Sequence, residues 1–292
     1  MRRQNSHIAP TVLLAAMLLA LPAPGAGQLI IDTHNLTTTD LPGLLDRVRA
    51  ADAVFVGESH ENADHHAAQL SVIKGLHQSG DRVAIGLEMF STDSQAALDG
   101  WIAGRIGETE FVPIFARNWA GGSWSSYRGI FLYAREHRIP MVALNVDRQV
   151  VSQVARHGFQ SLGEVPGTGV RNVRCDASER YQGFLREIIR RHGQARDQAM
   201  RYNRFCEAQV LWDAAMAWNL VDFLGKNPDR TVVVLAGLFH SWKHGIPERV
   251  RVQSSATTAV IVPSGPDSPF GYGLTREDAD YIWWFEGGAR DA

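Results

Sequence analysis

The sequence predicts an α/β fold with a mostly parallel central sheet flanked by helices. Its short apolar runs are nearly continuous rather than alternating, as expected of parallel strands covered on both faces. Helical patterns lie between these runs, and strand alternating with helix is typical of this class. A much longer, mostly helical segment precedes the fourth run and predicts a helical insert. The five runs cover 53–57, 83–89, 141–146, 231–237 and 258–262.

The segments between the runs carry apolar residues at helical spacing. The stretches 65–78 and 127–137 each place their apolar residues on one helix face. A further helix over 149–158 ends at Gly158, as a glycine C-cap would end it. After a Gly-Pro loop come a charged helical stretch at 177–194 and a long helix. We interpret about 160–205 as a helical insert on a single domain that spans 28–292.

The length and the net charge of the chain limit its domain count and the classes of function that it supports. The chain has 292 residues, of which 45% are hydrophobic, and a net charge of −2. That length suits one large domain or two small ones. The near-neutral balance gives no support for nucleic-acid binding, which normally needs a basic surface.

The N-terminus has the pattern of a secretory signal peptide over 1–27. Arg2 and Arg3 precede an apolar run at 12–21, and small residues follow it. The run is shorter than the roughly 20 residues that cross a bilayer, although an uncleaved anchor is the alternative. No cysteine stands there to carry a lipid anchor. We expect an exported, soluble protein, periplasmic if the host is a Gram-negative bacterium.

The two cysteines, Cys175 and Cys206, could form a disulfide in an oxidising compartment. Closing a loop of about 30 residues would stabilise the fold by about 3–4 kcal/mol in the chain-entropy model. The alternative is two free thiols in a helical segment. The sequence leaves the choice open, because pairing depends on the distance between the two Cα atoms.

Titratable side chains follow the predicted strands at the points where those strands end. Glu58 and His60 come after the first strand, Glu88 and Asn145 end the second and third, and His240 follows the fourth. The carboxyl ends of parallel strands share one edge of the sheet, where α/β folds place their sites. We therefore predict that Glu58, His60, Glu88 and His240 form one cluster.

The chemistry of this cluster has two interpretations. Glu88 interrupts an apolar run, so its carboxylate should be paired, hydrogen-bonded or protonated. His60, Glu88 and His240 could bind a divalent metal, or the cluster could supply a general base and an orienting acid. His65 and His66 lie on the following helix, where they either support the cluster or face solvent. The sequence has no nucleophile elbow, phosphate loop or dinucleotide fingerprint.

Several longer stretches together resemble a known family. They include "VFVGESHENADHH", "IGLEMFSTDSQAALDGW", "EAQVLWDAAMAWNL" and "VVVLAGLFHSWKHGIPERV", and with others they cover most of 50–262. In this order they resemble the ChaN-like haem-binding uptake proteins of the wider Tiki, TraB and erythromycin-esterase superfamily. The resemblance implies an α/β sheet domain in an exported protein concerned with haem or iron. The chain departs from the family in lacking a lipoprotein cysteine and in having Glu61 where Asp is expected.

The resemblance also implies a chemistry for the strand-end residues. The wider superfamily includes hydrolases that use an early Gly-Glu-x-x-His-like turn, an acid and a late histidine. These features fall here on Glu58, His60, Glu88 and His240.

A haem site needs an axial ligand, an apolar pocket and cations for the propionates. Tyr202 is our first choice of ligand in the insert, because Arg201 and Arg204 flank it and an arginine helps to keep a tyrosine ionised. Tyr181 and His192 are further candidates. Arginines of the insert would pair with the propionates. The alternative is a solvated, charged helix face.

Three functions follow from these patterns. The first is an exported haem-binding protein in haem or iron uptake, with haem, transport components and a possible homodimer as partners. The second is a metal- or histidine-dependent hydrolase that uses the strand-end cluster. The third is a partner-binding scaffold with a vestigial site. Because the insert and the cluster are different surfaces, the first two functions are compatible.

Overall fold

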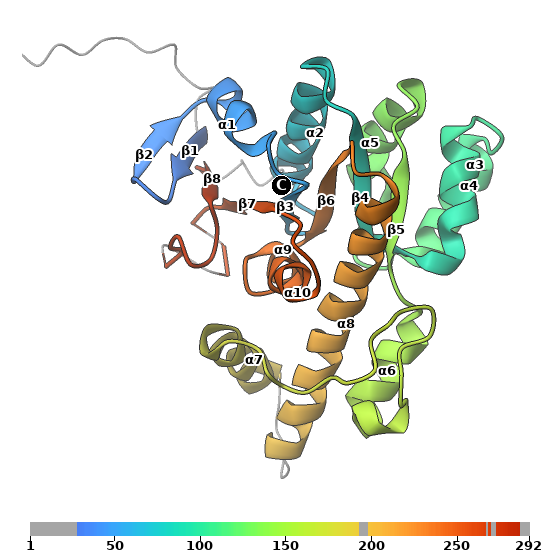
Figure 1. The fold of residues 1–292 in the computed structure, drawn as a ribbon, viewed down its shortest axis with the longest axis vertical. Coiled ribbons are helices and arrows are strands. Elements are labelled where there is room, and N and C mark those ends of the chain that lie inside the picture. The colour runs from blue at the N-terminus through green and yellow to red at the C-terminus, as the bar shows by residue number, and fades with distance from the viewer. Residues whose placement is uncertain (1–27, 193–197, 267, 270–272, 287–292) are drawn as a thin grey trace, which may run out of the picture.

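Eight strands form one sheet in the computed structural model, which describes residues 28–192, 198–266, 268–269 and 273–286. The order across the sheet is β2-β1-β8-β7-β3-β6-β4-β5 (Figure 1). The strands are β1 (Gln28–Asp32), β2 (Thr37–Thr39), β3 (Ala53–Glu58), β4 (Val83–Ser91), β5 (Met141–Asn145), β6 (Thr231–Gly237), β7 (Thr258–Ser264) and β8 (Tyr281–Phe285). The predicted α/β class with a mostly parallel sheet is confirmed.

The five predicted strands are β3 to β7, and they pair in parallel with one another. β8 joins them in parallel beside β7, whereas β1 pairs antiparallel with both β8 and β2. These three strands were not predicted. They add an edge to the sheet that lies away from the predicted cluster.

The described helices cover both faces of the sheet. The α-helices are α1 (Leu41–Val48), α2 (Ala63–Gln78), α3 (Gln95–Ile102), α4 (Glu108–Asn118), α5 (Trp124–Glu136), α6 (Arg148–His157), α7 (Glu179–His192), α8 (Gln198–Lys226), α9 (Leu238–Ser241) and α10 (Ile246–Gln253). Two short 3₁₀ turns are η1 (Thr92–Ser94) and η2 (Phe159–Ser161).

Two hydrophobic cores form on opposite faces of the sheet. Along β3, Val54 and Val56 belong to the core covered by α1 to α5, whereas Ala53 and Phe55 belong to the core covered by α6, α7, α8 and α10. Successive strand residues point to opposite faces. A strand that is buried on both sides must therefore be apolar at every position, which explains the continuous runs in the sequence.

Local capping sets the helix ends beside the cluster. The side chain of Asn62 accepts hydrogen bonds from the backbone at the start of α2, and the side chain of Asp147 does the same for α6. Gly158 ends α6 with a φ of 81°, a left-handed conformation that favours glycine. The helix end that the sequence predicts at Gly158 is thereby confirmed.

The predicted insert is a loop followed by α7 and the first turns of α8. Figure 1 shows α6 and α7 on either side of this part of α8, beyond the sheet. The boundary predicted near residue 205 falls inside α8, which continues without a break into the core. Cys175 and Cys206 form a disulfide, with their Cα atoms 5.3 Å apart, so the free-thiol alternative is wrong.

No helix in the described ranges is long and apolar enough to cross a membrane. The predicted signal peptide, residues 1–27, lies outside the described residues.

Candidate functional site

The strand ends bring the four predicted residues together. Glu58 ends β3, Glu88 lies near the end of β4, and His240 lies on α9 directly after β6. The Nδ1 atom of His60 is 2.9 Å from Oε1 of Glu58, and the Nε2 atom of His240 is 3.7 Å from Oε1 of Glu88. The predicted juxtaposition is therefore present in the structure.

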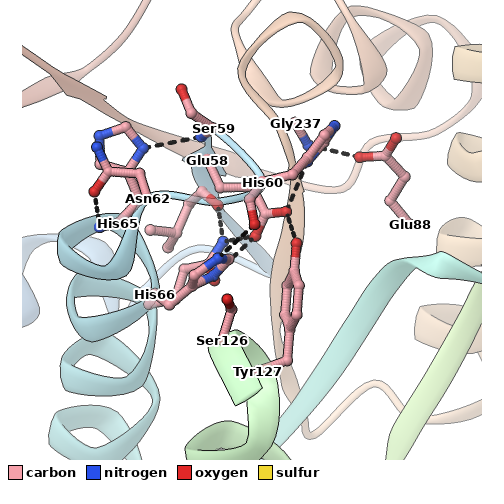
Figure 2. Close-up of polar contacts among 12 residues, drawn as sticks. Glu58, Ser59, His60, Asn62, His65, His66, Glu88, Ser126, Tyr127 and Gly237 are labelled. Atoms are coloured by element: carbon pink, nitrogen blue, oxygen red, sulfur yellow. Dashed lines mark hydrogen bonds and ion pairs between the residues drawn. The ribbon is translucent and has the colours of Figure 1, made fainter. Parts of the chain in front are cut away.

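Glu58 is the centre of the first half of the cluster (Figure 2). Its buried carboxylate accepts hydrogen bonds from His60, from Nε2 of Gln69 at 2.8 Å and from the hydroxyl of Tyr127, and His66 lies 3.4 Å away. Burial alone would raise the pKa of Glu58, but the bonds from His60 and His66 lower it to about 2. Glu58 is consequently a carboxylate at neutral pH.

The pKa values of the three histidines near Glu58 are shifted in different directions. Burial lowers the pKa of His60 and of His66, but the bonds and the negative charge of Glu58 outweigh it, so both pKa values are raised. His65 accepts a hydrogen bond from the backbone N–H of Ser59 at 2.9 Å, and burial lowers its pKa to about 4. His65 and His66 are both buried, so a solvated face is the wrong interpretation for them.

Glu88 and His240 form the second half of the cluster. Oε2 of Glu88 accepts a hydrogen bond from the backbone N–H of Gly237 at 2.6 Å, and Nδ1 of His240 donates to Oδ1 of Asp213 at 2.6 Å. Burial lowers the pKa of His240, but the charges of Glu88 and Asp213 outweigh it and raise the pKa to about 9. His240 is therefore an imidazolium at neutral pH, and both of its ring nitrogens carry protons.

Gly237 allows the two halves to approach each other. A Cβ atom at this position would lie 2.9 Å from Cε1 of His60 and 3.6 Å from Oε2 of Glu88. The φ of Gly237 is −53°, so glycine is needed here for space and not for a left-handed turn.

The cluster opens into a cavity of about 560 Å³. Aromatic side chains from different elements form much of its wall, namely Trp119, Phe184, Trp212 and Phe239. The side chain of His60 is 36% exposed whereas that of Glu58 is 1% exposed, so a molecule in the cavity can reach the histidine but not the carboxylate behind it. This arrangement suits an exposed histidine held in place by a buried acid.

Three residues of the cluster were not predicted from the sequence, namely Gln69, Tyr127 and Asp213. They lie on helices α2, α5 and α8, whereas the prediction considered only residues at the ends of strands. Asp213 left a signal, because it is a lone acid on a buried stripe of α8 that includes Cys206 and Ala217. A carboxylate in that position must be paired.

The metal interpretation is not supported. Within the described parts of the chain, no group of three or more His, Cys, Asp or Glu side chains is arranged to hold a metal ion.

The predicted haem residues of the insert lie in different environments. Tyr181 is fully buried and donates to Oδ2 of Asp213 at 2.8 Å, and burial raises its pKa well above the usual value. Tyr202 is half-buried and donates to Oε1 of Gln182 at 3.3 Å. Burial raises the pKa of Tyr202, and the nearby Arg186 lowers it in part.

Of the other predicted haem residues, Arg201 and Arg204 have described side chains. Arg201 is exposed, and Arg204 donates to the backbone carbonyl of Arg156 at 2.7 Å. His192 ends α7, but its side chain lies outside the described residues.

A second cavity, of about 820 Å³, lies between α6 and α8, and we call it the α6–α8 groove. Its walls include Val151, Phe205 and Trp212, and its rim carries Arg148, Arg156 and His157. It adjoins the cavity of the cluster, since Asn145, Arg148, Gln209 and Trp212 line both. The sequence indicated α6 but gave no reason to single out His157.

The fold and the site define an α/β protein with a buried histidine–carboxylate cluster at the carboxyl ends of its parallel strands. A family model described as haem-binding uptake, Tiki superfamily, ChaN matches residues 44–250. The chain belongs to this family, so the resemblance drawn from the sequence is confirmed.

Solved structures with TM-scores above 0.5 share the fold. ChaN of Campylobacter jejuni, solved with cofacial haem, has a TM-score of 0.71 and 20% identity over 90% of this chain and 98% of that chain. A succinoglycan biosynthesis protein has a TM-score of 0.52 and 11% identity over 83% of this chain and 90% of that chain. An erythromycin esterase in its open conformation has a TM-score of 0.48 and 15% identity over 76% and 72%. No curated protein matches the sequence.

Proposed function

We propose that the protein binds haem and serves in haem or iron uptake after export. The observation that carries this proposal is the match of a haem-binding family over residues 44–250. The structure of the Campylobacter jejuni ChaN, in which haem binds cofacially, supports the same ligand for the shared fold.

The α6–α8 groove has the chemistry that a haem requires. Its volume of about 820 Å³ lies within the usual range of ligand pockets. Phe205 and Trp212 offer flat apolar surface to the porphyrin, and Arg148 and Arg156 offer guanidinium groups to the propionates. When bound, haem supplies an iron with an axial coordination position for a protein donor.

Two side chains compete as the axial ligand. His157 is exposed on the rim of the groove and presents an imidazole. Tyr202, our first choice from the sequence, lies one turn before Phe205 on α8, but its hydroxyl faces Gln182. We propose His157 as the donor of the groove and keep Tyr202 as the alternative. Tyr181 would have to leave Asp213 and a fully buried position to bind iron.

Titration of the mature protein with hemin tests the proposal. We expect saturable binding, with a Soret band that changes in His157→Ala and persists in His137→Ala, a control in which the exposed histidine also stands at a helix C-terminus. Arg156→Ala should weaken binding by about 10-fold through loss of a charge-assisted hydrogen bond. A spectrum that changes only in Tyr202→Phe would reassign the ligand to the insert. Absence of saturable binding would reject the haem function.

Export and partners are part of the same proposal. The basic start and the short apolar run of the sequence support cleavage near residue 27. An uptake role would need transport components as partners, and a homodimer would let two copies bring their haems face to face. Mass spectrometry of the exported protein should find a mature N-terminus near Gln28. An intact peptide spanning Met1 to Gln28 on the exported protein would contradict this.

The cluster supports a second function, the hydrolysis of carboxylic esters. The observation that favours it is the pair of differently held histidines on one cavity. His60 has Glu58 on Nδ1, and in its neutral form it accepts a proton from water on Nε2 while the water oxygen bonds to the ester carbonyl carbon. Burial lowers the pKa of His60, but Glu58 raises it above the usual value, so this neutral form is gained as pH rises. His240, held as an imidazolium, stabilises the oxyanion and gives its proton to the departing alkoxide. The products are a carboxylic acid and an alcohol.

Hydrolysis of p-nitrophenyl butyrate tests the second function. The rate should fall about 100-fold or more in His60→Gln and in His240→Gln, and it should persist in the remote control His77→Gln. The rate should also decline as pH rises through about 9, where His240 loses its proton. An equal rate in wild type and in both site variants would reject ester hydrolysis.

A further inference from the structure

Asp213 connects the helical insert to the strand-end cluster. It lies on α8, is fully buried and accepts one hydrogen bond on each carboxylate oxygen. Oδ1 accepts from Nδ1 of His240 at 2.6 Å, and Oδ2 accepts from the hydroxyl of Tyr181 at 2.8 Å. A carboxylate held at both oxygens has a fixed orientation, so it can fix the orientation of the groups bonded to it.

We infer that Asp213 and Tyr181 are positioning residues that hold the imidazole of His240 with its Nε2 atom toward the cavity. This inference rests on the proposed ester hydrolysis for its function. It changes the role of Tyr181 from the haem ligand that the sequence suggested to a support of the strand-end cluster. It also makes the insert a part of that cluster.

The hydrogen bond to Asp213 determines the orientation of the His240 ring among its neighbours. Charged or titratable groups face His240 from three directions, namely Glu88 from β4, Asp213 from α8 and His60 from the segment after β3. The ring of Trp212 packs against it with ring centroids 4.9 Å apart. Only a ring with Nδ1 on Asp213 places Nε2 toward Glu88, at 3.7 Å, on the wall of the cavity. Loss of that bond would free the ring to rotate out of this orientation.

Several contacts fix the helix that carries Tyr181. Arg180 pairs with the buried Asp278, and Phe184 stacks on Phe239 with centroids 3.7 Å apart. The disulfide between Cys175 and Cys206 ties the preceding loop to α8. Because α7 is anchored on both sides of Tyr181, its hydroxyl reaches Asp213 from a fixed position. This is the geometry expected of an outer partner that orients a working histidine.

A purely structural role is the competing explanation, in which Tyr181 only satisfies a buried carboxylate. The two explanations differ in what a hydroxyl deletion does to His240. If Tyr181 only satisfies Asp213, Tyr181→Phe lowers stability and leaves the His240 imidazole unchanged. If Tyr181 positions the ring, the same change alters the proton signal of the imidazole as well.

The experiment is NMR of the full chain labelled with ¹⁵N-histidine, with the His240 ring assigned from its loss in His240→Gln. We expect a downfield Nδ1–H signal that shifts in Tyr181→Phe and is lost or strongly displaced in Asp213→Asn. The rate of p-nitrophenyl butyrate hydrolysis should fall about 10-fold in Tyr181→Phe, as losses of outer partners do. The matched control is Tyr133→Phe, which deletes a hydroxyl 2.9 Å from His77 and should leave the His240 signal in place.

The outcomes separate this inference from the function on which it rests. A His240 signal that is unchanged in Tyr181→Phe overturns the role of Tyr181, whatever the rate, even if Asp213→Asn fails to fold. A signal that responds as expected in a protein that hydrolyses no ester supports the positioning and rejects the reaction.

Discussion

At the residue scale, the cluster depends on one position without a side chain. Gly237 donates its backbone N–H to Glu88 and leaves room for His60 on its other side. The sequence cannot indicate which groups meet at this glycine, because His60 follows a strand that lies about 180 residues earlier in the chain.

We predict that Gly237→Ala displaces His60. The new Cβ atom would stand 2.9 Å from Cε1 of His60, closer than ordinary contacts allow, so the ring must move from its bond with Glu58. NMR of the His60 ring should report the change, together with a loss of stability of about 1–3 kcal/mol from overpacking. The control is Gly183→Ala on α7, where a Cβ meets no atom and should stabilise the helix by about 1 kcal/mol. An unchanged His60 signal in Gly237→Ala would contradict the crowding.

The candidate site could be predicted from the sequence only where strands end. Glu58, His60, Glu88 and His240 follow from that rule, because parallel strands deliver their ends to one edge. Asp213 does not follow, because its position depends on how α8 is rotated against the sheet. That rotation is set by packing across the whole helix, which no local pattern of the sequence contains.

At the element scale, the predicted strands and the missed ones differ in burial. β3 to β7 are buried along almost their whole length, and so they appear as continuous apolar runs. β8 is buried only at alternate residues, and β1 and β2 have exposed positions at the edge. Short edge strands carry a weaker pattern and depend on their neighbours for pairing. The partners β1 and β8 lie at opposite ends of the chain.

A disulfide links the loop before α7 to α8. Cys175 and Cys206 close a loop with a sequence separation of 31 residues. We predict that the double variant Cys175→Ser, Cys206→Ser loses about 3–4 kcal/mol in the free energy of unfolding, because the unfolded chain regains the freedom of that loop. Urea unfolding measures the loss, and wild-type protein kept in reductant should match the variant. Equal stability of oxidised and reduced protein would show that the crosslink does not constrain the unfolded chain.

At the scale of the whole molecule, the sheet separates two cores that meet at one titratable centre. The helices over the first core carry His65 and His66 on α2 and Tyr127 on α5, and α8 over the second core carries Asp213. The cluster lies where these two layers reach the ends of β3, β4 and β6. Protonation of the cluster therefore acts on the packing of both layers together, and the global stability should report it.

We predict that the free energy of unfolding is greatest near neutral pH and falls on both sides. The pKa of His65 is about 4 in the folded protein and 6.5 when unfolded, so its contribution is lost as pH falls from 6.5 toward 4. The pKa of Glu58 is lowered from 4.5 to about 2, which extends the loss to lower pH. The pKa of His240 is raised from 6.5 to about 9, so its contribution is complete below 6.5 and is lost as pH rises to 9.

Urea unfolding between pH 4 and pH 10 measures this profile. Because the pKa of His240 is raised to about 9, His240→Gln should reduce the decline between pH 6.5 and pH 9, to which His60 and His66 also contribute, while leaving the acid side in place. The control His34→Gln changes an exposed histidine near β1 and should keep both sides of the profile. A wild-type free energy that stays constant from pH 6.5 to pH 9 would contradict an imidazolium held between Glu88 and Asp213, because a His240 whose pKa is raised to about 9 must make stability fall as pH rises through that range.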